Sequence, residues 1–238
     1  MTSAHPEHSG PTRAAGDFLR TQRDVALGRA VIADVRSALI TVTGPDRLTW
    51  LNSLITQDVL GLTPGHTVES LLLNPQGRVE HAFFLTDDGV TTWLRVPAEG
   101  VDALESWLRS MVFRMDVTLE RPEDLLVVTS TSEAVLAGLT ARVVFSDPWP
   151  LVGAGSVGYA EDVHPGHDWD IHSAVVSRAD VGVLSVPTVT PDHLDALSIA
   201  AARPTMRDVD EKTLPHELDW LRSSNRERIQ VVGGHGRY

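Results

Sequence analysis

The stretch from residue 40 to residue 80 constrains the fold of this chain more than any other. It begins with alternating β-branched residues, turns at residues 44–46, and continues with apolar side chains at helical spacing. Asp46 stands where a helix N-cap is expected. A turn at Pro64-Gly65 precedes a second apolar run, which ends at residues 74–77. This order predicts strand, turn, helix, turn and strand within one short segment.

The composition excludes several classes of function. The chain has 238 residues, enough for one large domain or two small ones, and no cysteine, so disulfides and cysteine-ligated metals are excluded. Its net charge of −12 argues against a nucleic-acid partner. No apolar run approaches the roughly 20 residues of a membrane span, and the first residues lack a signal-peptide core. We therefore expect a cytoplasmic protein with no membrane partner.

The remaining patterns predict an α+β fold. A hairpin is expected from residues 82–85 and 90–96, joined by an Asp-Gly turn. An amphipathic helix is expected at 98–111, followed by a strand at 112–119. Because helices fall between non-consecutive strands, we expect mixed and antiparallel sheets with flanking helices rather than a doubly wound sheet.

Two motifs suggest ligands but lack the required context. Residues 153–158 fit the dinucleotide fingerprint, yet Pro150 precedes them and the following residues are poor helix formers, so we expect a loop and no nucleotide. A second group has metal-capable side chains in a loop rich in glycine and proline: His164, His167, Asp168, Asp170 and His172. Such a loop does not hold ligands in place, so we expect no metal site.

Three fragments resemble the folate-binding YgfZ proteins, which are relatives of the glycine-cleavage T-protein, a tetrahydrofolate-dependent aminomethyltransferase. The fragments are DFLRTQRDVALGRAVI, then VTGPDRLTWLNSLITQDV with LTPG and LLLNPQGRVEH, then AAARPTMRDVDEKTLPHELDWL. The resemblance covers residues 17 to 221. It implies a fold like the folate-binding domain of the aminomethyltransferases, with a central cavity for tetrahydrofolate or a derivative.

The resemblance also implies a division of the chain. We expect a disordered tail at residues 1–16 and a first folate-binding-type subdomain at 17–120. A second subdomain at 121–222 would complete the cavity. Residues 223–238 would be an atypical tail, because YgfZ proteins continue at this point into a Lys-Gly-Cys-Tyr-x-Gly-Gln-Glu loop and a C-terminal β-barrel. We expect the chain to lack both.

Eight residues are candidate folate ligands, from three parts of the chain: Thr56, Gln57, Asp58, Asn74, Arg78, His81, Arg203 and Glu217. The first three would line the cavity or cap the helix that ends there. Asn74 and Arg78 lie in a turn that the resemblance places beside the cavity, although Gly77 could make this turn purely structural.

Arg203 and Glu217 have both structural and ligand-binding interpretations. Arg203 follows an apolar helix, where it could satisfy free carbonyls, bind a folate's carboxylate tail, or pair with a buried carboxylate. Glu217 could accept hydrogen bonds from the amino and ring N–H groups of a pterin.

Two departures from the T-protein pattern argue against aminomethyl transfer. The T-protein has a carboxylate near the reactive nitrogen of folate, where this chain has His81 and Ala82. Ala200 replaces a pterin-binding glutamate. We therefore name no catalytic residue.

We expect a folate-binding accessory protein that assists the assembly or maintenance of iron–sulfur enzymes, with those enzymes or assembly proteins as partners. One alternative is a tetrahydrofolate-dependent aminomethyltransferase, which predicts that Glu80 points into the cavity. The other alternative is a truncated remnant, which predicts a collapsed or open cavity.

Overall fold

The computed structural model describes residues 11–150, 163–183 and 186–220. It contains two five-stranded sheets. The first sheet is antiparallel throughout, in the order β3-β4-β5-β2-β6. Its strands are β2 (Ser37–Thr43), β3 (Thr67–Leu73), β4 (Val79–Asp87), β5 (Thr91–Pro97) and β6 (Thr118–Glu120).

The second sheet joins the beginning of the chain to its second half, in the order β10-β1-β7-β9-β8. It is antiparallel except for the parallel pair of β1 and β10. Its strands are β1 (Val31–Ala33), β7 (Leu125–Ser130), β8 (Val143–Ser146), β9 (His172–Ser177) and β10 (Thr188–Val189).

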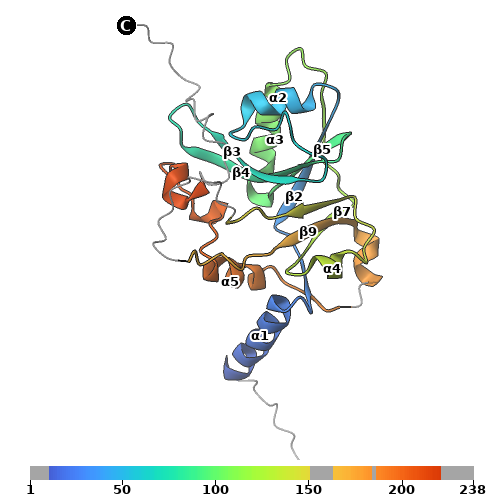
Figure 1. Cartoon of the computed structure of the whole chain (residues 1–238), viewed down its shortest axis with the longest axis vertical. Helices are drawn as coiled ribbons and strands as arrows, with labels where there is room; N and C mark the ends of the chain where they lie inside the picture. Colours follow the sequence, from blue (N-terminus) through green and yellow to red (C-terminus); the bar gives the residue numbers. More distant parts are fainter. Residues whose placement is uncertain (1–10, 151–162, 184–185, 221–238) are drawn as a thin grey trace, which may run out of the picture.

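α-Helices lie on the outer face of each sheet, whereas most of the first helix extends away from the body of the molecule (Figure 1). The α-helices are α1 (Pro11–Ala26), α2 (Arg47–Leu54), α3 (Val101–Ser110), α4 (Glu133–Leu136) and α5 (Asp192–Ala200). The 3-10 helices are η1 (Ala98–Gly100), η2 (Arg178–Val183), η3 (Met206–Asp208) and η4 (Pro215–Leu218). Helices α2 and α3 pack on the first sheet, whereas α1, α4 and α5 pack on the second.

The inner faces of the sheets pack against each other. Side chains at alternate positions of each strand meet there, among them Leu39, Phe84 and Trp93 from the first sheet and Val127 and Val175 from the second. Their neighbours along the strands face the helices, as the period of two requires. The molecule therefore has four layers, helix, sheet, sheet and helix, and the space between the sheets is available for a site.

The predicted α+β architecture with mixed and antiparallel sheets is confirmed, as is the hairpin of β4 and β5. The strand predicted at 112–119 is wrong, since only Thr118–Glu120 is extended. Phe113 has a positive φ of 41°, which breaks strand geometry. Asp46 occupies the N-cap position of α2, but its carboxylate accepts a hydrogen bond from the backbone N–H of Asp116 instead of capping the helix.

The division of the chain is placed as follows. Helix α1 begins at Pro11, so residues 11–16 are helical rather than part of a disordered tail, with proline in the first turn where its missing N–H is not needed. The boundary expected after residue 120 falls between β6 and β7, which belong to different sheets, but β1 from the first half belongs to the second sheet. No helix in the described ranges is long and apolar enough to cross a membrane.

Candidate functional site

A cavity of about 400 Å³ opens at one end of the space between the sheets. Its wall comes from β3, β4 and β5 on one side and from the residues flanking β8, β9 and α5 on the other. Aromatic and charged side chains make most of the inner wall: Asp34, Glu69, Phe84, Arg95, Asp147, Trp169, Arg203 and Trp220. We call the five charged residues, Asp34, Glu69, Arg95, Asp147 and Arg203, the inter-sheet cluster.

Arg203 is the centre of this cluster. Helix α5 ends with Ala202 in the left-handed region, with φ of 49°, and the chain then turns Arg203 inward. Its guanidinium donates to Glu69 Oε1 at 2.8 Å, to Asp147 Oδ2 at 3.0 Å and to the carbonyl of Pro204 at 3.1 Å. It also lies over the ring of Phe84 and over that of Trp149. Each of its three nitrogens therefore donates a hydrogen bond within the protein.

Burial governs the ionisation of this group of charges. The side chains of Arg203, Glu69 and Asp147 are between 5 and 7% exposed. Burial raises the pKa of Glu69 above its usual range, although the nearby Arg203 charge opposes this shift. Burial alone would lower the pKa of Arg203, but Asp147 and Glu69 hold it above its ordinary value. Arg203 is therefore always charged, whereas burial makes Glu69 easier to protonate than an exposed glutamate.

A second buried pair completes the cluster. Arg95 NH2 lies 2.7 Å from Asp34 Oδ2, and its other nitrogens donate to the hydroxyls of Ser37 and Ser173. Its guanidinium lies 5.2 Å from the centre of the Phe84 ring, and that of Arg203 lies 5.5 Å away. Two guanidinium groups thus approach one aromatic ring in the cavity wall. The cluster as a whole has three carboxylates for two guanidinium groups.

Trp169 adds an unused donor to the wall. Its indole Nε1 is buried and has no hydrogen-bond partner among the described residues. An unpaired buried donor costs about 1–3 kcal/mol.

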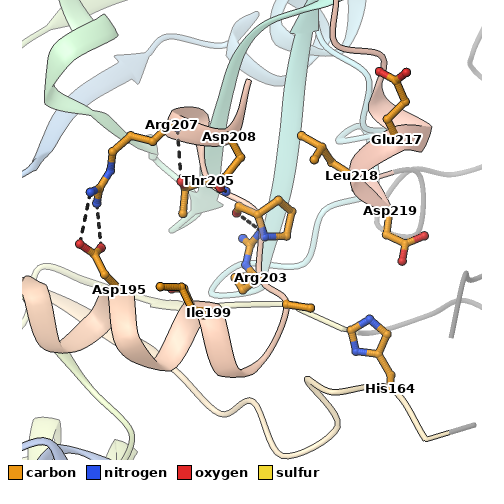
Figure 2. Close-up of a pocket in the computed structure, with 13 residues that line it drawn as sticks. His164, Asp195, Ile199, Arg203, Thr205, Arg207, Asp208, Glu217, Leu218 and Asp219 are labelled. Carbon is orange, nitrogen blue, oxygen red and sulfur yellow. Dashed lines mark hydrogen bonds and ion pairs between the residues drawn. The ribbon is translucent and has the colours of Figure 1, made fainter. Parts of the chain in front are cut away.

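A second hollow, of about 530 Å³, adjoins the cavity and shares the wall from Arg203 to Thr205 (Figure 2). Arg207 pairs with Asp195 at 2.7 Å there, and the carboxylate of Asp208 caps the backbone of Thr205. Both Arg36 and Arg207 bind Asp195, at the rim of the inner cavity. The outer hollow is therefore wider and more exposed than the inner cavity.

Two of the predicted ligand residues, Arg203 and Glu217, come together at the outer hollow. Only Arg203 also reaches the inner cavity. Glu217 is exposed, its Oε2 accepts from the backbone N–H of Leu214 at 2.8 Å, and its carboxylate points away from Arg203 (Figure 2). The structure thus gives Glu217 a capping contact and Arg203 the buried carboxylate partners that the sequence left as one of its alternatives.

Asn74 and Arg78 lie in the β3–β4 turn and line neither hollow. Asn74 Oδ1 accepts from the backbone N–H groups of Gln76 and Arg78, and Gly77 has the expected positive φ of 78°. The Arg78 guanidinium donates to the carbonyl of Glu211, which ties this turn to the late segment.

The remaining candidates lie on other faces of the first sheet. Thr56 pairs with the outer edge of β3 through two hydrogen bonds with Leu71. Gln57 is buried beside Ser70, and Asp58 is exposed and accepts from the N–H of Leu60. None of these three residues lines either hollow.

His81 is half-buried close to Gly100, so it lies on the α3 side of β4, and burial lowers its pKa. Ala82, its neighbour, lines the cavity.

Sequence reasoning missed four members of the inter-sheet cluster: Asp34, Glu69, Arg95 and Asp147. Two of them carried a signal, since Glu69 and Arg95 are charged residues within strands of otherwise apolar and small polar residues. A charge at such a position is rarely buried unless it is paired.

No group of three metal-capable side chains is assembled within residues 11–150, 163–183 and 186–220. Of the suggested metal ligands, His172 bonds to Asp170 and Ser146, and His167 pairs with Asp168. The glycine-rich fingerprint at 153–158 lies outside the described residues.

The fold is of the aminomethyltransferase type. Among solved structures, the chain is similar to the glycine cleavage system aminomethyltransferase T from Bartonella henselae, with a TM-score of 0.65 and 17% identity. The match covers 83% of this chain and 58% of that protein, so the chain spans less than two thirds of its length. No family model and no curated protein sequence matches the chain. The T-protein part of the resemblance is thus supported at the level of fold.

Proposed function

We propose that this chain is a tetrahydrofolate-binding accessory protein of the YgfZ type, with the pterin ring in the inner cavity, and that it is not an aminomethyltransferase by itself. One observation carries the proposal: a fold of the aminomethyltransferase type retains a cavity of about 400 Å³ between its sheets, with aromatic walls and buried charges. Small-molecule sites enclose about 300–1,000 Å³ and combine these features. A remnant without a ligand would be expected to have a collapsed or open cavity.

The β4 strand favours binding over transfer. Ala82 lines the cavity near the position where the T-protein pattern has a carboxylate, so this wall offers a methyl group. The neighbouring acid, Glu80, is exposed and lines neither hollow. The transferase alternative required Glu80 to point inward. A strand that carries no acid into the cavity has no fixed negative charge beside the reacting nitrogen.

The decisive experiment is calorimetric titration with 5-formyltetrahydrofolate of the wild type, Ala82→Leu and Glu80→Gln. The leucine side chain must project into the cavity from β4, so binding should fall at least about tenfold. Glu80→Gln alters an exposed neighbour and should bind as the wild type does. Circular dichroism of Ala82→Leu verifies its fold, since overpacking costs about 1–3 kcal/mol. Absence of heat with the wild type at millimolar ligand would refute folate binding.

The non-transferase part has its own assay. Wild-type protein with tetrahydrofolate and an aminomethyl donor should form methylenetetrahydrofolate no faster than the uncatalysed mixture. Catalysed formation that Glu80→Gln abolishes would support the transferase instead.

The accessory role in the cytoplasm is tested in cells. A strain without the gene should lose activity of iron–sulfur enzymes, and wild-type protein should restore that activity where Ala82→Leu does not. Equal restoration by both proteins would show that the accessory role does not depend on ligand binding in the cavity.

A further inference from the structure

Glu69 is the one carboxylate of the inter-sheet cluster that has an oxygen to spare. Asp34 accepts at both oxygens, from Arg36 N–H at Oδ1 and from Ser37 and Arg95 at Oδ2. Asp147 also accepts at both, from the N–H of Trp149 and from Arg203. Glu69 accepts only at Oε1, from Arg203. Its Oε2 takes no hydrogen bond from any residue that the structure describes.

The position of Glu69 directs this oxygen to a ligand. Glu69 pairs with Phe84 across β3 and β4, and both residues line the cavity. Its side chain is only 6% exposed, so bulk water is a poor alternative partner. The oxygen itself keeps some solvent access, unlike the buried indole nitrogens of Trp169 and Trp220, so a ligand in the cavity can reach it. A charge-assisted hydrogen bond to such a ligand is worth more than a neutral one.

The net charge of the cluster determines which functional groups of a ligand are favoured beside it. Three carboxylates face two guanidinium groups, and Arg203 is shared between Glu69 and Asp147. A ligand group that brings N–H donors is therefore favoured at this wall, and one that brings a carbonyl or carboxylate is disfavoured.

We propose that Glu69 Oε2 anchors the amino-pyrimidinone edge of the pterin by accepting from its exocyclic 2-amino group. This assignment rests on the proposed folate function and adds its recognition element. Because Arg203 occupies Oε1, the contact with the ring is a single charge-assisted hydrogen bond at Oε2 rather than a two-point pair. In the T-protein pattern, carboxylates stand near the position of Ala82 on β4 and at that of Ala200 at the end of α5. This chain lacks both, and Glu69 on β3 supplies a carboxylate in their place.

Pterin and lumazine test the assignment, because pterin has an amino group at C2 where lumazine has a carbonyl, with an accompanying hydrogen on N1. Each is measured by its displacement of 5-formyltetrahydrofolate from the wild type, Glu69→Gln and Glu80→Gln. The wild type should prefer pterin by at least about tenfold, since the lumazine carbonyl would face a carboxylate and leave it unpaired.

Glu69→Gln should abolish the preference, because an amide can present either its N–H₂ or its carbonyl to the ligand. Glu80→Gln is the matched control. It makes the same chemical change at an exposed residue that lines neither hollow, and should keep the preference for pterin.

The outcomes separate this assignment from the folate function itself. If 5-formyltetrahydrofolate does not bind to the wild type, the proposed function fails. If it binds but the wild type holds pterin and lumazine equally, the Glu69 assignment is overturned while folate binding stands. A preference that Glu69→Gln retains also overturns it, since Glu69 would then only join the two sheets through Arg203. If Glu69→Gln fails to fold, equal binding of pterin and lumazine by the wild type still overturns the assignment, and Glu69→Ala then takes the place of Glu69→Gln in the comparison.

Discussion

The turn at residues 74–77 and the inter-sheet cluster use polar side chains in opposite ways. In the turn, Asn74 accepts hydrogen bonds from residues two and four positions ahead. In the cluster, Arg203 joins Glu69, 134 positions away in the sequence, and Asp147, 56 positions away. The hydrogen bonds of the turn are made among neighbouring residues, whereas the cluster exists only when both sheets are assembled.

This difference indicates which residues of such a fold bind a ligand and which ones direct local folding. The turn has a recognisable sequence pattern because its requirements are local, including a positive φ at Gly77. The cluster has no such pattern, yet it lines the cavity. Because the residues of the cluster come from distant parts of the chain, the assembled fold can hold several buried charges close together, which a short motif cannot do. We expect ligand binding to follow the cluster and local folding to follow the turn.

Removing the Arg203 side chain should have the largest effect. Arg203→Ala leaves Glu69 and Asp147 buried without their shared cation, so the free energy of unfolding should fall by about 3–5 kcal/mol. Urea unfolding followed by circular dichroism measures the loss. The control is Arg78→Ala in the turn, which gives up one hydrogen bond to the Glu211 carbonyl and should cost at most about 1 kcal/mol. Equal losses of unfolding free energy in the two variants would contradict the difference drawn between the inter-sheet cluster and the turn.

Replacing Asp34 should come next. Asp34→Asn weakens hydrogen bonds to a charged partner, which are worth about 1.5–3 kcal/mol. The variant should also respond less to acid. Burial alone would raise the pKa of Asp34, but Arg95, Ser37 and the Arg36 N–H outweigh it and lower that pKa below the unfolded value. Stability from Asp34 is therefore present above its unfolded pKa and is lost as the pH falls through the folded pKa.

The acid profile is measured as the urea midpoint between about pH 6 and pH 2. Asp34→Asn should flatten the acidic limb of this profile. Glu69 acts in the opposite sense, since its raised pKa means that protonation favours the folded state as the pH falls. An Asp34→Asn profile parallel to that of the wild type would show that the pair with Arg95 does not set the acid stability.

Substitution in the turn should cost less and should leave binding unchanged. Asn74→Ala removes one acceptor shared by two backbone N–H groups, so we expect a loss of about 1–2 kcal/mol in the free energy of unfolding. Affinity for 5-formyltetrahydrofolate, measured by calorimetry, should stay within about twofold of the wild type. A tenfold weaker affinity at unchanged fold would place the turn in the binding site and break the comparison.

The predictability of the fold follows the same division. The β4–β5 hairpin and the helix at 101–110 were predictable because an Asp-Gly turn and a stripe of apolar residues are local signals. The strand predicted at 112–119 failed because Phe113 adopts a positive φ that alternation does not reveal. Nor did local pattern show that β1 leaves its neighbour β2 to join the other sheet, because the parallel partner of β1 is β10, more than 150 residues later.

The candidate site was predictable only in part, for a related reason. Arg203 stood out because it follows an apolar helix and precedes a proline, and it does reach the cavity. Glu69 and Arg95 are single charges within strands, and their partners are fixed only by the packing of two sheets. A sequence can flag such a charge as needing a partner, but it does not identify the partner.

Substitution of Glu217 should have the smallest effect on stability and binding. This residue combines features of the two regions, because it lines the outer hollow and yet its hydrogen bond is local, as in the turn. Its carboxylate caps the N–H of Leu214 from an exposed position. An amide oxygen can make the same bond, so Glu217→Gln should change the free energy of unfolding by at most about 0.5 kcal/mol. The same titration should find its affinity for 5-formyltetrahydrofolate within about twofold of the wild type. A tenfold loss would move the pterin edge from Glu69 to Glu217, so that the outer hollow, and not the space between the sheets, would hold the ring.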